Sequence, residues 1–340
     1  MAAKHLLLIG LLCLIFLSGC AAKPGGDWPV AAPEAQGMDS AKLEAAFQAL
    51  DDYPQYAVHS LLVVRQGVIV AEKYYQSYDQ DSQNTLYSCT KSVISALVGI
   101  AIEEGALKGV DQPVADFFPD AMQVNPDPRK DAMRLEDLLT MRAGLEWDEG
   151  NSAYNRMYAS ADWVAWMMNK PMLAEPGSEF NYCSGCTHVL SGVLHKATGM
   201  LTQEYARTRL FEPLGITNYT WETDASGNAI GGWGLELTAR DMAKFGSLFL
   251  QDGVWNGKQV VPKRWVAQST GPGLPTEGKW NYAYQWWVRP DEQVYAAQGL
   301  HGQKIYVVPD LQLVVVVTAG ADDDSRVGEL VLNGAMGAVK

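Results

Sequence analysis

The feature that most constrains the fold of this chain is segment 88–104, which is apolar around almost the whole of a helix. Its apolar residues recur at helical spacing and also cover the opposite side: Val93, Ile94, Ala96, Leu97, Val98, Ile100 and Ala101. Gly105 ends the pattern. A helix that is apolar on all sides is buried, so other elements must surround it. The chain is large enough for this, because 340 residues, 48% of them hydrophobic, can bury about 75% of their unfolded surface.

Strand patterns occur in pairs near both ends of the chain. The first pair lies at 60–65 and 68–71, and Gln66-Gly67 between them is typical of a hairpin turn. The second pair lies at 303–308 and 311–318. Short connections of this kind join antiparallel strands, so we expect an antiparallel sheet built from both chain ends.

Helical patterns fill most of the remaining chain: 39–52, 134–141, 161–168, 186–197, 202–210, 238–250 and 326–336. Most of them lie between the two strand pairs. We therefore expect an α+β fold in which helices flank the sheet and an all-helical domain is inserted between its halves. The α/β part is expected over about 39–110 and 230–340, and the helical insertion over about 111–229, all within one domain of residues 39–340.

The first twenty residues are typical of a targeting segment. Lys4 precedes an apolar run over 6–17, which is shorter than the ~20 residues of a membrane-spanning helix. The run ends in Leu17-Ser18-Gly19-Cys20, which resembles the lipobox of bacterial lipoproteins. The resemblance implies that residues 1–19 are a signal peptide, that Cys20 carries a lipid, and that 20–38 form the anchor and linker.

A lipid on Cys20 would hold the protein at a membrane, because each buried CH₂ group adds about 0.8 kcal/mol to membrane binding. The expected location is the bacterial cell envelope. Ala21 after the cysteine resembles the signal for the periplasmic face of the outer membrane in Gram-negative hosts. The alternative is an ordinary secretory signal in which Cys20 occurs by chance.

Charge and cysteine content bear on partners and cofactors. With 26 Lys and Arg against 39 Asp and Glu, the net charge is −13, so we expect no nucleic-acid partner. Cys183, Cys186 and His188 lack a fourth ligand nearby, so we expect no metal, and no motif indicates a cofactor. A disulfide among Cys89, Cys183 and Cys186 would be stable in an oxidising envelope, and its pairing stays open. The sequence specifies no oligomeric state.

A serine and a lysine stand three residues apart at the start of the apolar helix. At this spacing Ser88 and Lys91 project from one face of the helix. The helix N-terminus supplies N–H groups and partial positive charge where an oxyanion would form. Burial lowers the pKa of a lysine, so Lys91 is expected to accept a proton from Ser88.

Three motifs occur in the order found in the penicillin-recognising serine hydrolases: Ser88-Cys-Thr-Lys91, Tyr182-Cys-Ser184 and the glycine-rich Gly299-Leu-His-Gly-Gln303. The chain is most similar to the class C β-lactamase-related group, and within it to the branch of 6-aminohexanoate-dimer hydrolase and related esterases. Further matching stretches lie at 135–145, 176–182 and 234–246. Together the matches span about 39–335, and they imply a β-lactamase/transpeptidase-like fold.

The resemblance assigns roles to individual residues. Ser88 matches the nucleophile that becomes acylated, Lys91 the base, and Tyr182 the residue that passes a proton to the leaving group. Chemistry supports these roles, because serine needs an adjacent base and a phenol near Lys⁺ is expected to ionise more readily. The backbone N–H of Ser88, with that of Leu300 or His301, would form the oxyanion hole.

Two departures from class C β-lactamases bear on the substrate. Ser184 stands where those enzymes have Asn; its hydroxyl can bond Lys91 but lacks the two amide donors. Their Lys-Thr-Gly signature is replaced by Gln298-Gly299-Leu300, and His301 would supply a cation only when protonated. Both departures favour an ester or amide substrate, neutral ones included, over a β-lactam. The expected partner is a small-molecule ester, amide or peptide substrate.

We therefore predict a serine hydrolase that acts on amide or ester bonds through an acyl-enzyme. The alternatives are a β-lactamase or D-Ala-D-Ala carboxypeptidase and, from another functional class, a non-catalytic binding or scaffolding lipoprotein of the envelope.

Overall fold

The computed structural model describes residues 28–121, 124–321 and 324–340. The expected signal peptide and Cys20 lie outside the described residues. Within the described part, none of the helices combines the length and apolar character needed to cross a bilayer.

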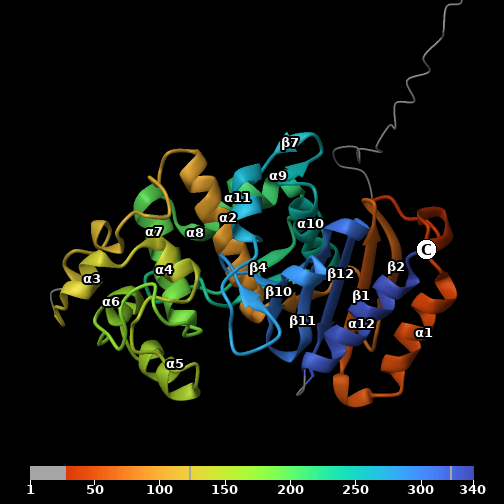
Figure 1. Ribbon diagram of the computed structural model, residues 1–340, viewed down its shortest axis with the longest axis horizontal. Coiled ribbons are helices and arrows are strands. Elements are labelled where there is room, and N and C mark those ends of the chain that lie inside the picture. Colours follow the sequence, from red (N-terminus) through yellow and green to blue (C-terminus); the bar gives the residue numbers. More distant parts are fainter. Residues whose placement is uncertain (1–27, 122–123, 322–323) are drawn as a thin grey trace, which may run out of the picture.

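The main sheet is antiparallel and has seven strands in the order β2-β1-β12-β11-β10-β9-β8. Their bounds are β1 (Val58–Arg65), β2 (Val68–Tyr74), β8 (Asn281–Tyr282), β9 (Trp287–Arg289), β10 (Val294–Gly299), β11 (Gln303–Val308) and β12 (Leu313–Ala319). The first strand of the chain pairs with the last, so both chain ends meet inside one sheet (Figure 1). This confirms the predicted sheet.

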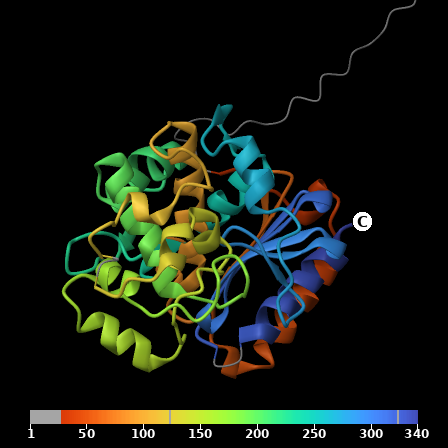
Figure 2. The same ribbon diagram turned by 60° about the vertical axis from the view of Figure 1, so that its left-hand side comes forward.

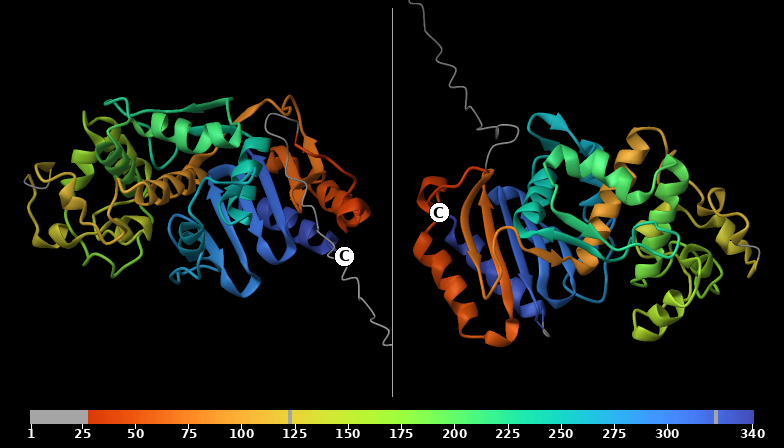
Figure 3. Two further views of the ribbon diagram at one scale, coloured as in Figure 1. Left: turned by 90° about the horizontal axis from the view of Figure 1, so that it is seen from above. Right: turned by 180° about the vertical axis from the view of Figure 1, so that it is seen from behind.

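Helices cover both faces of the sheet (Figure 3). On one face α1 (Ser40–Asp51) packs beside α12 (Asp324–Ala338). On the other face lie α2 (Thr90–Glu103) and α10 (Ala239–Leu250). Side chains alternate along the strands, so Leu61 of β1 belongs to the core beneath α1 and α12, whereas Leu62 belongs to the larger core around α2.

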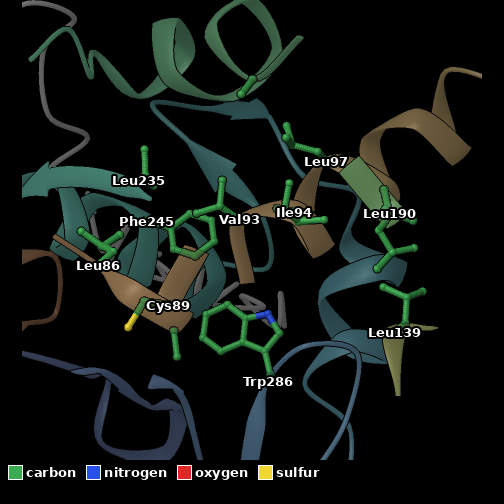
Figure 4. Close-up of a cluster of buried hydrophobic side chains, with 14 of the residues drawn as sticks. Leu86, Cys89, Val93, Ile94, Leu97, Leu139, Leu190, Leu235, Phe245 and Trp286 are labelled. Atoms are coloured by element: carbon green, nitrogen blue, oxygen red, sulfur yellow. The ribbon is translucent and has the colours of Figure 1, made fainter. Parts of the chain in front are cut away.

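Helix α2 is buried from Thr90 to Ala101, as its apolar sequence predicts. Its core neighbours come from both the sheet side and the helical side of the molecule (Figure 4). Gly99 is required by close packing, because a Cβ there would lie 2.2 Å from the Trp265 ring of α11 (Lys263–Ser269).

The helical part lies to one side of the sheet, beyond α2 (Figure 2). Its helices are α3 (Pro128–Ala132), α4 (Leu135–Leu139), α5 (Asn151–Tyr158), α6 (Trp163–Met168), α7 (Ser184–Thr198), α8 (Thr202–Ala206) and α9 (Glu212–Leu214). A π-helical turn, η6 (Arg207–Phe211), joins α8 to α9, so the helix predicted over 202–210 begins as an α-helix and continues as a π-helix.

Short strands form two small sheets that sequence patterns missed. β3 (Gln83–Thr85), β5 (Leu235–Thr238) and β4 (Tyr219–Trp221) form one, and β6 (Val254–Trp255) with β7 (Lys258–Gln259) forms the other. Because β4 falls within 111–229, the prediction that this segment is entirely helical is wrong. Its three residues form a strand because they pair with β5, and they are too few to show a periodic hydrophobic pattern in the sequence.

Candidate active site

Ser88 lies one residue before the N-cap of α2, in the short 3₁₀ turn η3 (Tyr87–Cys89). The prediction that α2 begins at Ser88 is therefore wrong. Tyr87 has a left-handed backbone with φ 46°, which turns the chain sharply just before the serine. Gly299 at the end of β10 packs against this turn, since a Cβ there would lie 2.2 Å from the Leu86 carbonyl oxygen. Ser88 is thus fixed in the wall of a cavity of about 630 Å³.

Lys91 lies behind Ser88 and is only 1% exposed. Its Nζ is 2.9 Å from Ser88 Oγ, 2.9 Å from Ser184 Oγ and 2.8 Å from the Gly232 carbonyl oxygen. Burial lowers the pKa of Lys91 to about 8, although the nearby Glu149 carboxylate opposes the shift. A minor fraction of this lysine, far larger than for an ordinary lysine, is therefore neutral at pH 7 and able to accept a proton.

Tyr182 contacts both members of the serine–lysine pair. Lys91 Nζ lies 4.9 Å from the centre of its ring, and Tyr182 lines the same cavity as Ser88. The ring stacks on Trp287 with centres 5.8 Å apart. Burial raises the pKa of Tyr182, and the nearby Ser88 hydroxyl opposes this only in part. The prediction that Lys⁺ would ease its ionisation is therefore wrong, and Tyr182 is a neutral phenol that can donate a proton.

Ser184 begins α7 and is held by Glu149, a residue that the sequence motifs did not single out. The Ser184 hydroxyl donates to Glu149 Oε1, and its backbone N–H donates to Glu149 Oε2 at 3.1 Å. Trp147 and Tyr154 donate to the same carboxylate. Glu149 lies at the exposed mouth of the cavity, 35 residues before Ser184 in the chain. Only the match over 135–145, which ends just before it, pointed to this segment.

The side chains of the two residues predicted for the oxyanion hole lie on different sides of the loop. Leu300 lines the cavity beside Ser88 and is 57% exposed. The His301 side chain lies outside that cavity: its Nδ1–H donates to the Ala321 carbonyl oxygen at 3.1 Å, and it lines a second cavity with His59. His301 has a left-handed backbone with φ 62°. The imidazole is therefore not placed to supply a cation to the cavity beside Ser88, whereas the role of the His301 backbone N–H stays a prediction.

Aromatic side chains form much of the cavity wall. Trp233, Tyr154, Tyr158 and Trp287 line it together with Tyr182. The Trp233 ring lies edge-on to that of Tyr154 with centres 5.0 Å apart. The cavity is thus suited to an apolar chain or ring attached to the reacting carbonyl group.

A disulfide joins Cys183, which lies between Tyr182 and Ser184, to Cys186 in the first turn of α7. This resolves the pairing that the sequence left open. Cys89 is buried outside the disulfide, and its thiol donates to the Gln303 carbonyl oxygen at 3.4 Å. In the described residues no group of three or more His, Cys, Asp and Glu side chains is arranged to hold a metal ion.

Comparison with known proteins is consistent with this geometry. A family profile described as Beta-lactamase matches residues 43–330. The chain is 27% identical over 317 residues to a 6-aminohexanoate-dimer hydrolase from Paenarthrobacter ureafaciens, with 84% of this chain and 79% of that protein covered.

Solved structures share the fold at low identity. A family VIII carboxylesterase superposes with a TM-score of 0.74 and 17% identity, covering 91% of this chain and 98% of the esterase. The octameric penicillin-binding protein homologue from Pyrococcus abyssi gives a TM-score of 0.71 and 19% identity, covering 88% and 78%. These likenesses confirm the predicted fold class.

Proposed function

Because this chain belongs to the beta-lactamase family, we propose that it is a serine hydrolase that cleaves ester or linear amide bonds through an acyl-enzyme on Ser88. One observation carries the proposal. Lys91 is almost completely buried, has a lowered pKa and places Nζ 2.9 Å from Ser88 Oγ. Burying a lysine lowers the stability of the fold, so a buried lysine beside a serine needs a functional explanation. Service as the general base that activates the serine provides one.

The other contacts of Lys91 support its role as base. The Gly232 carbonyl oxygen can only accept a hydrogen bond. Ser184 already donates its hydroxyl proton to Glu149, so it too accepts from Lys91. In the neutral amine, two N–H groups are therefore engaged by these acceptors, and the lone pair faces Ser88. Ser88 then donates its proton to Nζ.

The proposed reaction has two stages. Ser88 Oγ attacks the substrate carbonyl carbon while its proton passes to Lys91, and the backbone N–H groups of Ser88 and Leu300 bind the oxyanion. Tyr182 donates its proton to the leaving amine or alcohol as the bond to the carbonyl carbon breaks, and it regains a proton from Lys91. Water then attacks the ester to Ser88, releasing the acid and restoring the serine.

An ester or linear amide is the substrate class that the cavity favours, and Lys304 is among the residues that line it. No Lys-Thr-Gly motif follows the turn beside Ser88, and His301 points away from the cavity. Aromatic rings cover much of the wall. The names of similar proteins, a 6-aminohexanoate-dimer hydrolase and a carboxylesterase, agree with amide and ester chemistry.

A fluorophosphonate probe tests the nucleophile. The wild type should be labelled, whereas Ser88→Ala should not; Ser92→Ala, which alters another serine of the same helix, is the matched control and should be labelled. Turnover is then measured with p-nitrophenyl esters, short linear amides, nitrocefin and D-Ala-D-Ala peptides. Labelling of Ser88→Ala at the wild-type level would disprove the nucleophile, and no turnover of any substrate would favour the scaffolding alternative.

We also propose that Cys20 is lipidated and holds the enzyme in the bacterial envelope. The Leu17-Ser18-Gly19-Cys20 sequence supports this. Incorporation of labelled palmitate into the wild type but not into Cys20→Ala, with the protein in the membrane fraction, is the expected result. Equal incorporation by both would contradict it.

A further inference from the structure

A buried histidine on α7 connects an acidic side chain to the backbone segment that holds Lys91. His188 is 0% exposed, and its ring lies edge-on to Trp163. Its Nε2 lies 3.1 Å from Asp224 Oδ2, and its Nδ1 lies 3.3 Å from the backbone nitrogen of Gly231. The next residue, Gly232, provides the carbonyl oxygen that accepts from Lys91 Nζ.

The partners of the imidazole fix which nitrogen carries the proton. Gly231 N–H can only donate, so Nδ1 must be the acceptor. Nε2 must therefore carry the proton and donate it to Asp224. Although burial raises the pKa of Asp224, hydrogen bonds from His188, Ser226 and Asn228 outweigh it and lower the pKa to about 2. The acceptor on which this tautomer depends is thus a carboxylate at neutral pH.

The segment held by His188 has no side chains of its own to fix it. Gly231 and Gly232 lie flat against α7: a Cβ on Gly231 would lie 2.4 Å from the Thr187 carbonyl oxygen, and one on Gly232 would lie 2.8 Å from that of Ser184. Glycine is the most mobile residue of the backbone, so external contacts must orient these peptide groups. Trp221 Nε1 donates to the Ile230 carbonyl oxygen at 2.9 Å, and His188 accepts from the N–H of the same peptide unit.

We propose that Asp224 and His188 are positioning residues that act through Gly231 and Gly232 to aim Lys91 at Ser88. The inference rests on the proposed function, since it assigns a role within the same site. Asp224 sets the tautomer of His188, His188 fixes the Gly231 peptide, and Gly232 then holds one N–H of Lys91 so that the amine faces the nucleophile.

Replacing Asp224 by asparagine separates this role from a simple role in folding. Oδ1 of Asp224 accepts from Ser226 N, Ser226 Oγ and Asn228 N at 2.9, 2.6 and 3.0 Å, and an asparagine oxygen can keep all three bonds. Its NH₂ group would then face His188 Nε2. Two donors cannot bond each other, so the imidazole proton moves to Nδ1 and the acceptor for Gly231 is lost.

The test compares full-length wild type, Asp224→Asn and the matched control Ser226→Ala, which alters the same turn without facing His188. Saturating fluorophosphonate labelling gives kinact and KI, and imidazole ¹⁵N shifts give the tautomer. In Asp224→Asn we expect kinact to fall about tenfold or more, with KI unchanged within about twofold. Ser226→Ala should match the wild type. The double variant His188→Asn/Asp224→Asn should recover part of the rate, because an asparagine oxygen at 188 can again accept from Gly231.

A measurement that does not depend on catalysis tests the role of Asp224 separately from the proposed function. The ¹³Cε titration of Lys91 should shift to lower pH by about half a unit or more in Asp224→Asn, because its charged form loses a well-placed acceptor. An unchanged Lys91 titration, or wild-type kinact despite a reversed tautomer, would overturn the inference. Failure of the wild type to be labelled at all would instead refute the proposed function, and the Lys91 titration would still decide the role of Asp224.

Discussion

The lowered pKa of Lys91 predicts how the reactivity of Ser88 depends on pH. Only the neutral amine can accept the serine proton. With the pKa at about 8, the neutral fraction is about 9% at pH 7 and about 50% at pH 8. At the ordinary lysine value of 10.5 the fraction at pH 7 would be about 0.03%, so burial increases the available base about 300-fold.

The assay is the rate of fluorophosphonate labelling between about pH 6 and pH 9, with circular dichroism at each pH to verify folding. The logarithm of the rate should rise with a slope near one and level off around pH 8. Lys91→Arg should show no such rise, because guanidinium stays protonated over this range. Lys244→Arg is the matched control: Lys244 pairs with Asp241 on α10 and does not line the cavity.

A flat profile between about pH 6 and 7.5 would refute the reasoning, because it would show that proton transfer to Lys91 does not limit acylation. So would rapid labelling of Lys91→Arg. A midpoint near the ordinary lysine value would show that burial does not change the lysine as the structure indicates.

Three further predictions concern the same region. The folded-state pKa of Lys91, about 8, lies below the unfolded value of 10.5, so the unfolded chain binds more protons between these pH values and the unfolding free energy rises with pH by about 3 kcal/mol. Urea unfolding of the wild type and of Lys91→Met near pH 8 and near pH 10.5 measures this rise. A difference in unfolding free energy between the two proteins that stays the same at both pH values would contradict the prediction. Ser184→Ala should lower kcat about tenfold or more at similar KM, because Lys91 loses an acceptor, whereas Ser184→Thr should retain activity. Reduction of the Cys183–Cys186 disulfide should lower the unfolding free energy by about 2 kcal/mol on the chain-entropy estimate for so short a loop, and an unchanged thermal midpoint in dithiothreitol would argue against it.

The parts of the fold that the sequence predicts are those with long, regular hydrophobic patterns. The helix over 88–104 and the strand pairs at both chain ends each have enough residues to show their period. Strands β8 and β9, with two and three residues, are too short for this. They are held by pairing, because β9 pairs with β10 and β8 pairs with β9. The start of α2 was misplaced because the left-handed Tyr87 leaves no mark in a hydrophobic pattern.

The site was predictable only where its residues are close in sequence or belong to a family motif. Ser88 and Lys91 are three residues apart, and Tyr182 and Ser184 are separated by one. Glu149 reaches Ser184 across 35 residues, and only the packing of the loop after α4 against the start of α7 brings them together. His301 has a left-handed backbone with φ 62°, and composition and spacing do not specify such a conformation.

One sequence feature accounts for the position of Ser88 and for the lowered pKa of Lys91, the proposed catalytic pair. Helix α2 is fixed because apolar side chains pack against it on every side, and this immobility holds Ser88 against the end of β10. Burial within the same core excludes water from Lys91 and destabilises its charged form, although its Nζ keeps three polar partners. A polar face on α2 would admit water to the lysine and return its pKa toward the ordinary value. A more apolar replacement of Lys91 would remove the base. Under the proposed function, the apolar character of the helix has a catalytic consequence as well as a structural one, because the unfavourable burial of one lysine supplies the base that Ser88 needs at neutral pH.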